Sequence, residues 1–142
     1  MPTRVRDLMT TKLVTLFAEQ AMPLAEEIMR FRHIRHLPVV EPSGKLVGLV
    51  SHRDILAANT SSLVGLSDEQ RRARQGSVLV KDIMTKDMWT VTPQTYAEVA
   101  AQTLLDHAYG CLPVVEDGKL VGILTERDFL KVAILHLRAN NA

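Results

Sequence analysis

The chain has 142 residues, of which 46% are hydrophobic, so it can bury the core of a compact domain. Seventeen basic and sixteen acidic side chains leave a formal net charge of +1, which argues against nucleic acid or an anionic membrane as the main partner. The start has no apolar signal segment and no stretch reaches the roughly 18 apolar residues of a membrane span, so we expect a cytoplasmic protein. The single cysteine, Cys111, excludes an internal disulfide and a multi-cysteine metal site.

The first half of the chain predicts the order strand, helix, strand, strand, helix. Leu24, Ile28 and Phe31 are spaced to share one helix face. The turn between the second and third strands contains Pro42 and Gly44, which are typical of a hairpin. The expected strands cover residues 13–16, 36–40 and 46–51, and the last helix begins near Ser51.

The linker at residues 63–79 is predicted to be a short helix. Ser67 and Gln70 have the spacing of a capping box, and Gly76 is expected to end the helix. Three arginines in the last turn complement the helix dipole, and no aromatic residues interleave with them. We therefore interpret them as a solvated face and not as a nucleic-acid patch.

The second half repeats the same order. A strand around residues 88–91 leads to a helix whose expected capping box is Thr95 with Glu98. The next hairpin turn is one residue shorter and contains Asp117-Gly118, and the last helix begins near Thr125. The expected inner face of the first helix comprises Val99, Ala100, Thr103 and Leu104. The apolar positions of the last helix are Phe129, Leu130, Ala133, Ile134 and Leu137.

Three motifs recur in the same order, so the two halves are copies of one unit. A tandem duplication of this kind predicts two equivalent candidate sites and not one catalytic centre. The motifs are Asp-hydrophobic-Met-Thr at 7–10 and 82–85, Leu-Pro-Val-Val at 37–40 and 112–115, and a glycine followed by Ser/Thr-x-x-Asp that ends at Asp54 and Asp128. The expected repeats are residues 5–62 and 80–142, joined by the linker at 63–79.

With these motifs, the chain resembles a tandem pair of cystathionine-β-synthase (CBS) domains, often called a Bateman module. The resemblance covers nearly the whole chain and implies an α/β (α+β) fold. It implies two β-α-β-β-α repeats packed sheet to sheet about a pseudo-two-fold axis. It also implies two clefts that bind adenosine-containing ligands, a homodimer, and regulation of an effector protein.

The Ser51-x-x-Asp54 step lies at a strand-to-helix junction, where unpaired backbone N–H groups can receive phosphate oxygens. An ionised Asp54 can accept two ribose hydroxyls together, and Arg53 can contact phosphate. A capping box is the structural alternative, although both copies carry Asp where capping boxes favour Glu or Gln. The second copy repeats the set with Thr125, Arg127 and Asp128.

The resemblance adds residues around the first strand and the Leu-Pro step, where backbone groups contact the adenine. A proline at a strand start lacks an N–H group, which suits an edge or a gap in the sheet. Plain strand packing is the alternative for the first-strand residues. The set is Thr15, Leu16, Arg35, His36, Leu37 and Pro38 in one copy, and Thr90, Val91, Gly110, Cys111, Leu112 and Pro113 in the other.

The two copies differ in charge just before the Leu-Pro step. The first cleft therefore suits extra phosphate, and we hypothesise that the two sites differ in affinity or in phosphate number. A solvated charged surface is the alternative. The first copy has Arg30, Arg32, His33, Arg35 and His36, and the second has Leu105, His107, Ala108, Gly110 and Cys111.

Several other patterns do not hold. The His-Arg-Asp sequence at 52–54 resembles a kinase catalytic loop, but the chain lacks both the Gly-rich loop and D-F-G. His33 and His36 have no third metal ligand. Cys111 has no histidine beside it and is interpreted as a packing residue, and Trp89 as a core or interface residue more than a base-stacking one.

The sequence thus favours a stand-alone regulatory module that binds AMP, ADP or ATP in two clefts and catalyses no reaction. One alternative is a dimerisation or docking module with vestigial clefts, and a weaker one is an enzyme acting on adenine nucleotides. Ribose and adenine contacts are common to these nucleotides, S-adenosylmethionine and NAD, so the ligand stays open. The effector and the arrangement of the dimer also stay open.

Overall fold

The computed structural model describes residues 2–63 and 65–141, and the chain folds into two compact units. The first-repeat unit is Val14–Met88, and the second-repeat unit combines Met1–Leu13 with Trp89–Ala142. Each predicted repeat therefore gives its opening segment to the unit built around the other repeat. The predicted linker at 63–79 lies within the first-repeat unit.

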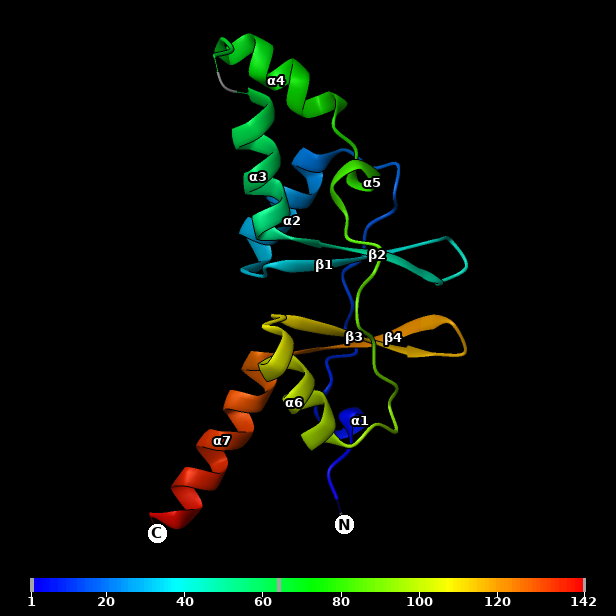
Figure 1. Ribbon diagram of the computed structural model, residues 1–142, viewed down its shortest axis with the longest axis vertical. Coiled ribbons are helices and arrows are strands. Elements are labelled where there is room, and N and C mark those ends of the chain that lie inside the picture. The colour runs from blue at the N-terminus through cyan, green and yellow to red at the C-terminus, as the bar shows by residue number, and fades with distance from the viewer. Residues whose placement is uncertain (1, 64, 142) are drawn as a thin grey trace. The chain divides into compact units, whose positions relative to one another are not determined.

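The first-repeat unit is built on an antiparallel hairpin covered by helices (Figure 1). Leu16 bridges to β1 in parallel, and Thr85 bridges to β2 in the antiparallel sense, so each hairpin edge gains one short extension. Helix α4 packs against α2 and α3. The elements are α2 (Met22–Arg32), β1 (His36–Val40), β2 (Leu46–Ser51), α3 (His52–Leu63), α4 (Asp68–Ser77) and α5 (Val80–Ile83).

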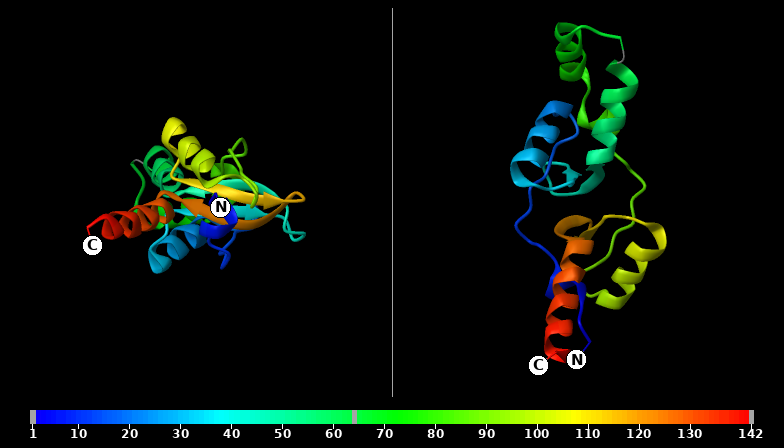
Figure 2. Two further views of the ribbon diagram at one scale, coloured as in Figure 1. Left: turned by 90° about the horizontal axis from the view of Figure 1, so that it is seen from below. Right: turned by 90° about the vertical axis from the view of Figure 1, so that its left-hand side faces the viewer.

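The second-repeat unit has the same plan. Val91 bridges to β3 in parallel and Thr10 bridges to β4 in the antiparallel sense. Helix α6 packs against β3 and α7 against β4, and the two helices also contact each other (Figure 2). The elements are α1 (Val5–Leu8), α6 (Ala97–His107), β3 (Cys111–Glu116), β4 (Lys119–Thr125) and α7 (Glu126–Asn140).

The structure confirms both predicted hairpins. In the first turn Gly44 has φ 94°, and in the second Asp117 and Gly118 have φ 53° and 79°, values that favour Gly, Asn or Asp. The strands expected at 13–16 and 88–91 are shorter than predicted. Among the described residues each is reduced to a single bridge, at Leu16 and at Val91.

Of the apolar residues expected to share one face of the helix at 22–32, Ile28 packs against the core, but Leu24 and Phe31 are exposed. Met22, Ala25 and Met29 are the buried residues of this helix, whereas Leu24 is 38% exposed and Phe31 is 83% exposed. Both sets have helical spacing, so the sequence pattern alone did not distinguish them. The hairpin packs against the stripe that carries the small Ala25.

The start and inner face of α6 also differ from the prediction. The helix begins at Ala97, and the Thr95 hydroxyl accepts a hydrogen bond from the Thr92 N–H group at 3.1 Å. Thr95 therefore closes a turn before the helix and does not form a capping box with Glu98. The buried residues of the helix are Ala97, Ala100 and Leu104, and Val99 is 51% exposed.

The capping box of the linker helix is confirmed. The Gln70 N–H group donates to Ser67 Oγ at 3.2 Å, and the Ser67 N–H group donates to Gln70 Oε1 at 3.0 Å. Gly76 does not end the helix, which continues to Ser77.

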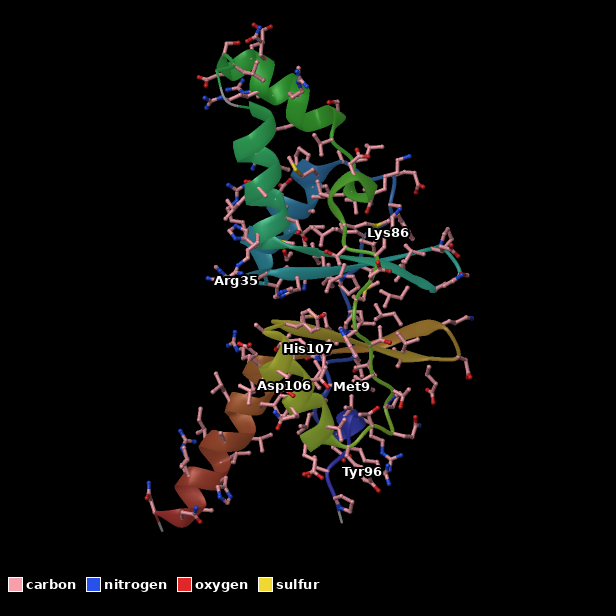
Figure 3. The ribbon with its side chains drawn as sticks, viewed as in Figure 1. Met9, Arg35, Lys86, Tyr96, Asp106 and His107 are labelled. Carbon is pink, nitrogen blue, oxygen red and sulfur yellow. The ribbon has the colours of Figure 1, made fainter. Side chains whose placement is uncertain are left out.

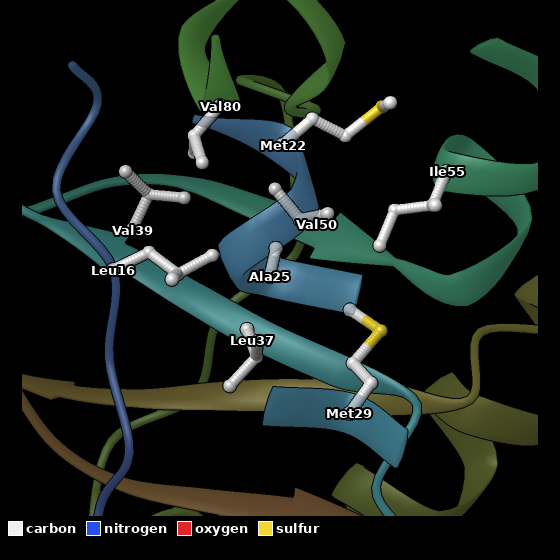
Figure 4. Close-up of a cluster of buried hydrophobic side chains, with 9 residues drawn as sticks. All are labelled: Leu16, Met22, Ala25, Met29, Leu37, Val39, Val50, Ile55 and Val80. Carbon is white, nitrogen blue, oxygen red and sulfur yellow. The ribbon is translucent and has the colours of Figure 1, made fainter. Parts of the chain in front are cut away.

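Each unit has its own hydrophobic core. In the first-repeat unit the core lies between the hairpin and its helices (Figure 4). Both cores include a residue from an exchanged opening segment, Val80 in one and Val5 in the other. The first core comprises Leu16, Met22, Ala25, Met29, Leu37, Val39, Val50, Ile55 and Val80. The second comprises Val5, Ala100, Leu104, Leu112, Val114 and Leu124.

The Asp-hydrophobic-Met-Thr motif fastens each opening segment to a sheet. The Met84 side chain covers Gly48, where an added Cβ would lie 2.5 Å from Met84 Sδ. At the equivalent place, a Cβ on Gly122 would lie 2.6 Å from Met9 Sδ. The glycine in each Val-Gly step is therefore needed for this close approach. Sequence reasoning noticed the motif but not its partner.

The aspartate of the same motif caps the short helix that it belongs to. Asp7 Oδ2 accepts from the Arg4 N–H group at 2.8 Å, and Asp82 Oδ2 accepts from the Leu79 N–H group at 2.9 Å. These carboxylates satisfy backbone donors at a helix start. Helices of four residues are too short to show a periodic pattern, and the sequence did not predict them.

Candidate functional site

The hairpin register brings two of the predicted site segments together in the first-repeat unit. His36 is paired with Ser51 across the strands. The His52 N–H group donates to the carbonyl oxygen of Arg35 at 2.8 Å, which joins the residue before β1 to the start of α3. Residues 35–38 and Ser51–Asp54, with Thr15 beside the bridge at Leu16, are called the first half-site below.

Within this half-site the Ser51-x-x-Asp54 step forms a reciprocal cap. The Ser51 N–H group donates to Asp54 Oδ2 at 2.7 Å, and the Asp54 N–H group donates to Ser51 Oγ at 3.2 Å. The structural alternative for this motif is thus realised. Within the described chain the carboxylate bonds only through Oδ2, so Oδ1 remains able to accept hydrogen bonds from a ligand.

The second half-site, with residues 110–113, Thr90 and Thr125–Asp128, has the same strand pairing and the same use of an aspartate oxygen as a cap. Cys111 is paired with Thr125 across β3 and β4. The Thr125 N–H group donates to Asp128 Oδ2 at 2.8 Å, and the Thr125 hydroxyl lies 3.4 Å from the same oxygen. Asp128 therefore also uses Oδ2 for the cap and keeps Oδ1 for other donors.

The backbone of Leu16 is already occupied by the sheet. Its N–H group donates to the Pro38 carbonyl oxygen and its own carbonyl oxygen accepts from the Val40 N–H group, both at 2.9 Å. Its side chain is 1% exposed. Val91 has equivalent bonds to β3, at 3.1 and 2.8 Å. These bonds match the alternative of strand packing for both residues, and their contact with a ligand stays a prediction.

The two Leu-Pro steps lie beside these single bridges. The backbone N and carbonyl oxygen of one strand residue point to the same side, so the missing N–H group of Pro38 lies on the Leu16 side of β1. On that side of β1, the described residues form a single parallel bridge, between Leu16 and Val39. Both prolines and the leucines before them are buried.

The remaining predicted residues differ in exposure. The exposed ones can meet solvent or a ligand directly, whereas buried Cys111 can offer only its backbone. Arg35, Arg53, Thr90 and Arg127 are exposed, and Thr15, His36, Gly110, Ser51, Asp54, Thr125 and Asp128 are half-buried.

The Cys111 thiol has low reactivity. Burial, with a further contribution from the charge of Asp128, raises the pKa of its thiol from 9.0 to about 12. A thiol that keeps its proton is a poor nucleophile. Among the described residues no group of three or more His, Cys, Asp or Glu side chains could hold a metal ion.

Trp89 lies outside both hydrophobic cores and outside the strands β1 to β4. It is 52% exposed and stacks on His107, with ring centroids 4.9 Å apart and an interplanar angle of 21°. His107 in turn stacks on Tyr109 at 5.4 Å and 18°. Sequence reasoning missed this three-ring stack because Trp89 is separated from its partner by the whole of α6.

The family model described as CBS domain matches this chain twice, over residues 5–61 and 80–134. The chain belongs to the CBS-domain family. The CBS resemblance and the α/β fold of two repeats are therefore confirmed. Among the described residues, no helix is both long enough and apolar enough to span a membrane.

Two of the curated relatives contain the matching region within a longer chain. The chain is 28% identical over 96% of its length to the uncharacterized protein MJ1225 of Methanocaldococcus jannaschii, but it spans only 47% of that relative. Inosine-5′-monophosphate dehydrogenase of Korarchaeum cryptofilum is 34% identical over 88% of this chain, which spans 23% of the enzyme. The similarity to that enzyme thus concerns its CBS part.

Solved structures agree over almost the full chain. A putative acetoin utilization protein (AcuB) from Vibrio cholerae is 34% identical with a TM-score of 0.84, covering 99% of this chain and 97% of that one. CBSX2 of Arabidopsis thaliana in complex with AMP is 31% identical with a TM-score of 0.80, covering 94% and 97%.

A third solved structure carries other adenosine derivatives. The CBS domain pair of MJ0100, in complex with 5′-methylthioadenosine and S-adenosyl-L-methionine, is 25% identical with a TM-score of 0.78 and covers 93% of this chain and 96% of that one. CBS pairs similar to this chain thus bind adenosine-type ligands.

Proposed function

We propose that this protein is a regulatory CBS pair that binds an adenosine-containing ligand at each half-site and catalyses no reaction. The observation that carries the proposal is the duplicated aspartate cap, in which Asp54 and Asp128 each keep one carboxylate oxygen for a ligand. Ribose hydroxyls are suitable donors to such an oxygen. The AMP bound to CBSX2 supports the ligand class. A cytoplasmic location stays a prediction.

A thermal-shift screen tests the proposal with AMP, ADP, ATP, S-adenosylmethionine and NAD. A ligand that binds only the folded state at 100 times its Kd adds about 2.7 kcal/mol of stability, which raises Tm by several degrees. Asp54→Ala and Asp128→Ala should each weaken this shift. No shift with any of the five ligands at millimolar concentration would overturn the proposal.

The chain offers a matched control for each variant. Asp82 caps a helix start in the first-repeat unit, and Asp7 does so in the second-repeat unit. Asp82→Ala and Asp7→Ala therefore lose a comparable cap outside the half-sites. They should lower Tm without reducing the ligand-induced shift, which separates loss of ligand binding from loss of fold stability.

We also propose that the protein is a homodimer joined through α7. Leu130, Ile134 and Leu137 share one face of this helix and are 62%, 47% and 59% exposed. An exposed apolar stripe of this kind is typical of an interaction surface. Analytical ultracentrifugation should find a dimer that Leu130→Lys with Leu137→Lys converts to monomer, whereas Lys131→Ala should leave it unchanged.

The same stripe supports the alternative function, a docking module for an effector protein with vestigial clefts. The two functions separate in one experiment, because ligand should change the stability or assembly of the dimer only in the regulatory case. A dimer that ignores all five ligands would favour the docking module.

A further inference from the structure

The two half-sites have matching strand registers but opposite charge. His33 and Ala108 occupy equivalent positions at the ends of α2 and α6, and both have left-handed backbone, with φ of 56° and 53°. With the matching strand registers, this equivalence pairs each residue around one half-site with a counterpart around the other. The counterparts can therefore be compared position by position.

Around the first half-site the charged side chains are mostly cationic. Arg35 and Arg53 are exposed, and the Arg35 carbonyl oxygen is bonded to the first residue of α3. Figure 3 shows Arg35 at the start of β1, near the end of α2. At the compared positions the first half-site has one aspartate, Asp54, and four arginines, namely Arg30, Arg32, Arg35 and Arg53.

Around the second half-site the balance is reversed. The counterparts of Arg30 and Arg35 are Leu105 and Gly110, and the counterpart of His52 is Glu126. The charge of Asp128 already acts on its neighbour, since it contributes to the raised pKa of Cys111. At the compared positions the second half-site therefore has one arginine, Arg127, and three carboxylates, namely Asp106, Glu126 and Asp128.

The second half-site also has a stack of rings that the first half-site lacks. His107 takes the position of Arg32 and Tyr109 that of Ile34, and both rings belong to the stack with Trp89 (Figure 3 labels His107). Trp89 directly precedes the predicted site residue Thr90. An exposed stack of rings offers an apolar contact and no charge for phosphate.

We propose that the first half-site selects adenosine polyphosphates and that the second selects adenosine derivatives whose 5′ substituent is uncharged or cationic, such as a thioether or a sulfonium. This proposal rests on the proposed function. Each phosphate charge is attracted by the arginines of one half-site and repelled by the carboxylates of the other. A sulfonium experiences the reverse.

Isothermal titration with ATP, AMP, S-adenosylmethionine and 5′-methylthioadenosine tests the proposal. Asp128→Ala leaves the first half-site intact. This variant should bind ATP about tenfold tighter than 5′-methylthioadenosine, and its affinity for ATP should fall as the salt concentration rises. Asp54→Ala leaves the second half-site intact and should give the opposite order. The same order at both half-sites would overturn this inference alone, and no binding of any ligand would overturn the proposed function as well.

The only tryptophan identifies which half-site responds. Trp89 lies in the second-repeat unit, so its fluorescence should change when 5′-methylthioadenosine binds to Asp54→Ala. It should not change when ATP binds to Asp128→Ala. A fluorescence change with ATP in that variant would place the nucleotide at the second half-site and contradict the proposal.

Exchange of one pair of counterparts tests the charge argument directly. Glu126→His should raise the affinity of the second half-site for ATP several-fold, and His52→Glu should lower that of the first to a similar extent. The affinity for uncharged 5′-methylthioadenosine should change much less than the affinity for ATP in both variants, and its binding also shows that they fold. Unchanged ATP affinity in both would exclude charge as the basis of selection.

Discussion

The two units share their interior and differ at their surface. Leu37 and Leu112 are both fully buried, both hairpins have a bulge in the Val-Val step, and both aspartate caps use Oδ2. Outside this frame, one half-site is surrounded by arginines and the other by carboxylates and stacked rings. Duplicated chains thus keep the residues that packing and hydrogen bonding require, while the remaining positions are free to give two sites different ligands.

The largest expected effect tests whether the two cores are equivalent. Leu37→Ala and Leu112→Ala each remove a fully buried side chain and should each cost about 2–5 kcal/mol of unfolding free energy. Denaturant unfolding measures both. Leu105→Ala, at a position that is 76% exposed, should change stability by no more than about 0.5 kcal/mol.

The shape of these transitions also shows whether the units unfold together. If they do, each variant moves a single transition. If the units unfold separately, each variant moves only one of two transitions. A loss below about 0.5 kcal/mol in Leu112→Ala would mean that the second core is not packed as described.

The next effect compares the two methionine contacts. Gly48→Ala and Gly122→Ala should each cost about 1–3 kcal/mol, because the added methyl group overlaps Met84 or Met9. The two costs should be similar, since each added Cβ also meets one atom that cannot rotate away, Met84 Cβ at Gly48 and the Thr10 backbone oxygen at Gly122, both at 3.2 Å. Thermal unfolding of both variants measures the two costs.

A second substitution sharpens the result. Met84→Ala in the Gly48→Ala background should restore part of the lost stability, and Met9→Ala should restore a similar part in Gly122→Ala, because each removes the Sδ and Cγ atoms that the added methyl group overlaps. No rescue at either site would show that the methionine side chain is not the cause of the loss.

The sequence predicted those parts of the fold that depend on local chemistry or on repetition. Gly44 and Asp117-Gly118 have backbone angles typical of such turns, so both hairpins were predictable. The cap between Ser67 and Gln70 was predictable for the same reason. The two Ser/Thr-x-x-Asp steps were found because they occur twice, and the strand register then brings each beside its Leu-Pro step.

The errors lie where tertiary packing chooses between alternatives that look alike in sequence. Two apolar stripes fit α2, and only the packed hairpin decides that Met29 is buried and Phe31 is exposed. Thr95 could begin a helix, but the turn with Thr92 uses its hydroxyl. The stack of Trp89 on His107 joins residues that no local pattern connects.

The pH effect of a buried thiol on stability should be confined to the second-repeat unit. The thiol of Cys111 has a folded pKa of about 12 against an ordinary value of 9.0, so the folded state keeps a proton that the unfolded chain loses. Its contribution is fully present below pH 9 and is lost as pH rises from 9 to about 12, at about 1.4 kcal/mol per pH unit.

The comparison of wild type with Cys111→Ala isolates this contribution, because lysine and tyrosine titrations are common to both. Unfolding free energies at pH 8, 9 and 10 should converge or cross as pH rises, with wild type losing more. Parallel pH profiles would contradict the raised pKa of the Cys111 thiol. The first-repeat unit has His36 at this position, so it has no equivalent thiol.

The smallest effect concerns the three-ring stack and its charged counterpart. His107→Ala should remove the ring between Trp89 and Tyr109 and cost about 0.5–1 kcal/mol, because an exposed aromatic pair contributes little. Arg32→Ala, the equivalent change in the first-repeat unit, should leave both stability and Trp89 emission nearly unchanged. Trp89 emission is the more sensitive measurement, because it depends on the ring next to Trp89 even where the free energy of unfolding hardly changes. If His107→Ala left the emission unchanged, the rings would not be stacked in solution, and the aromatic difference between the two half-sites would disappear while their charge difference remained.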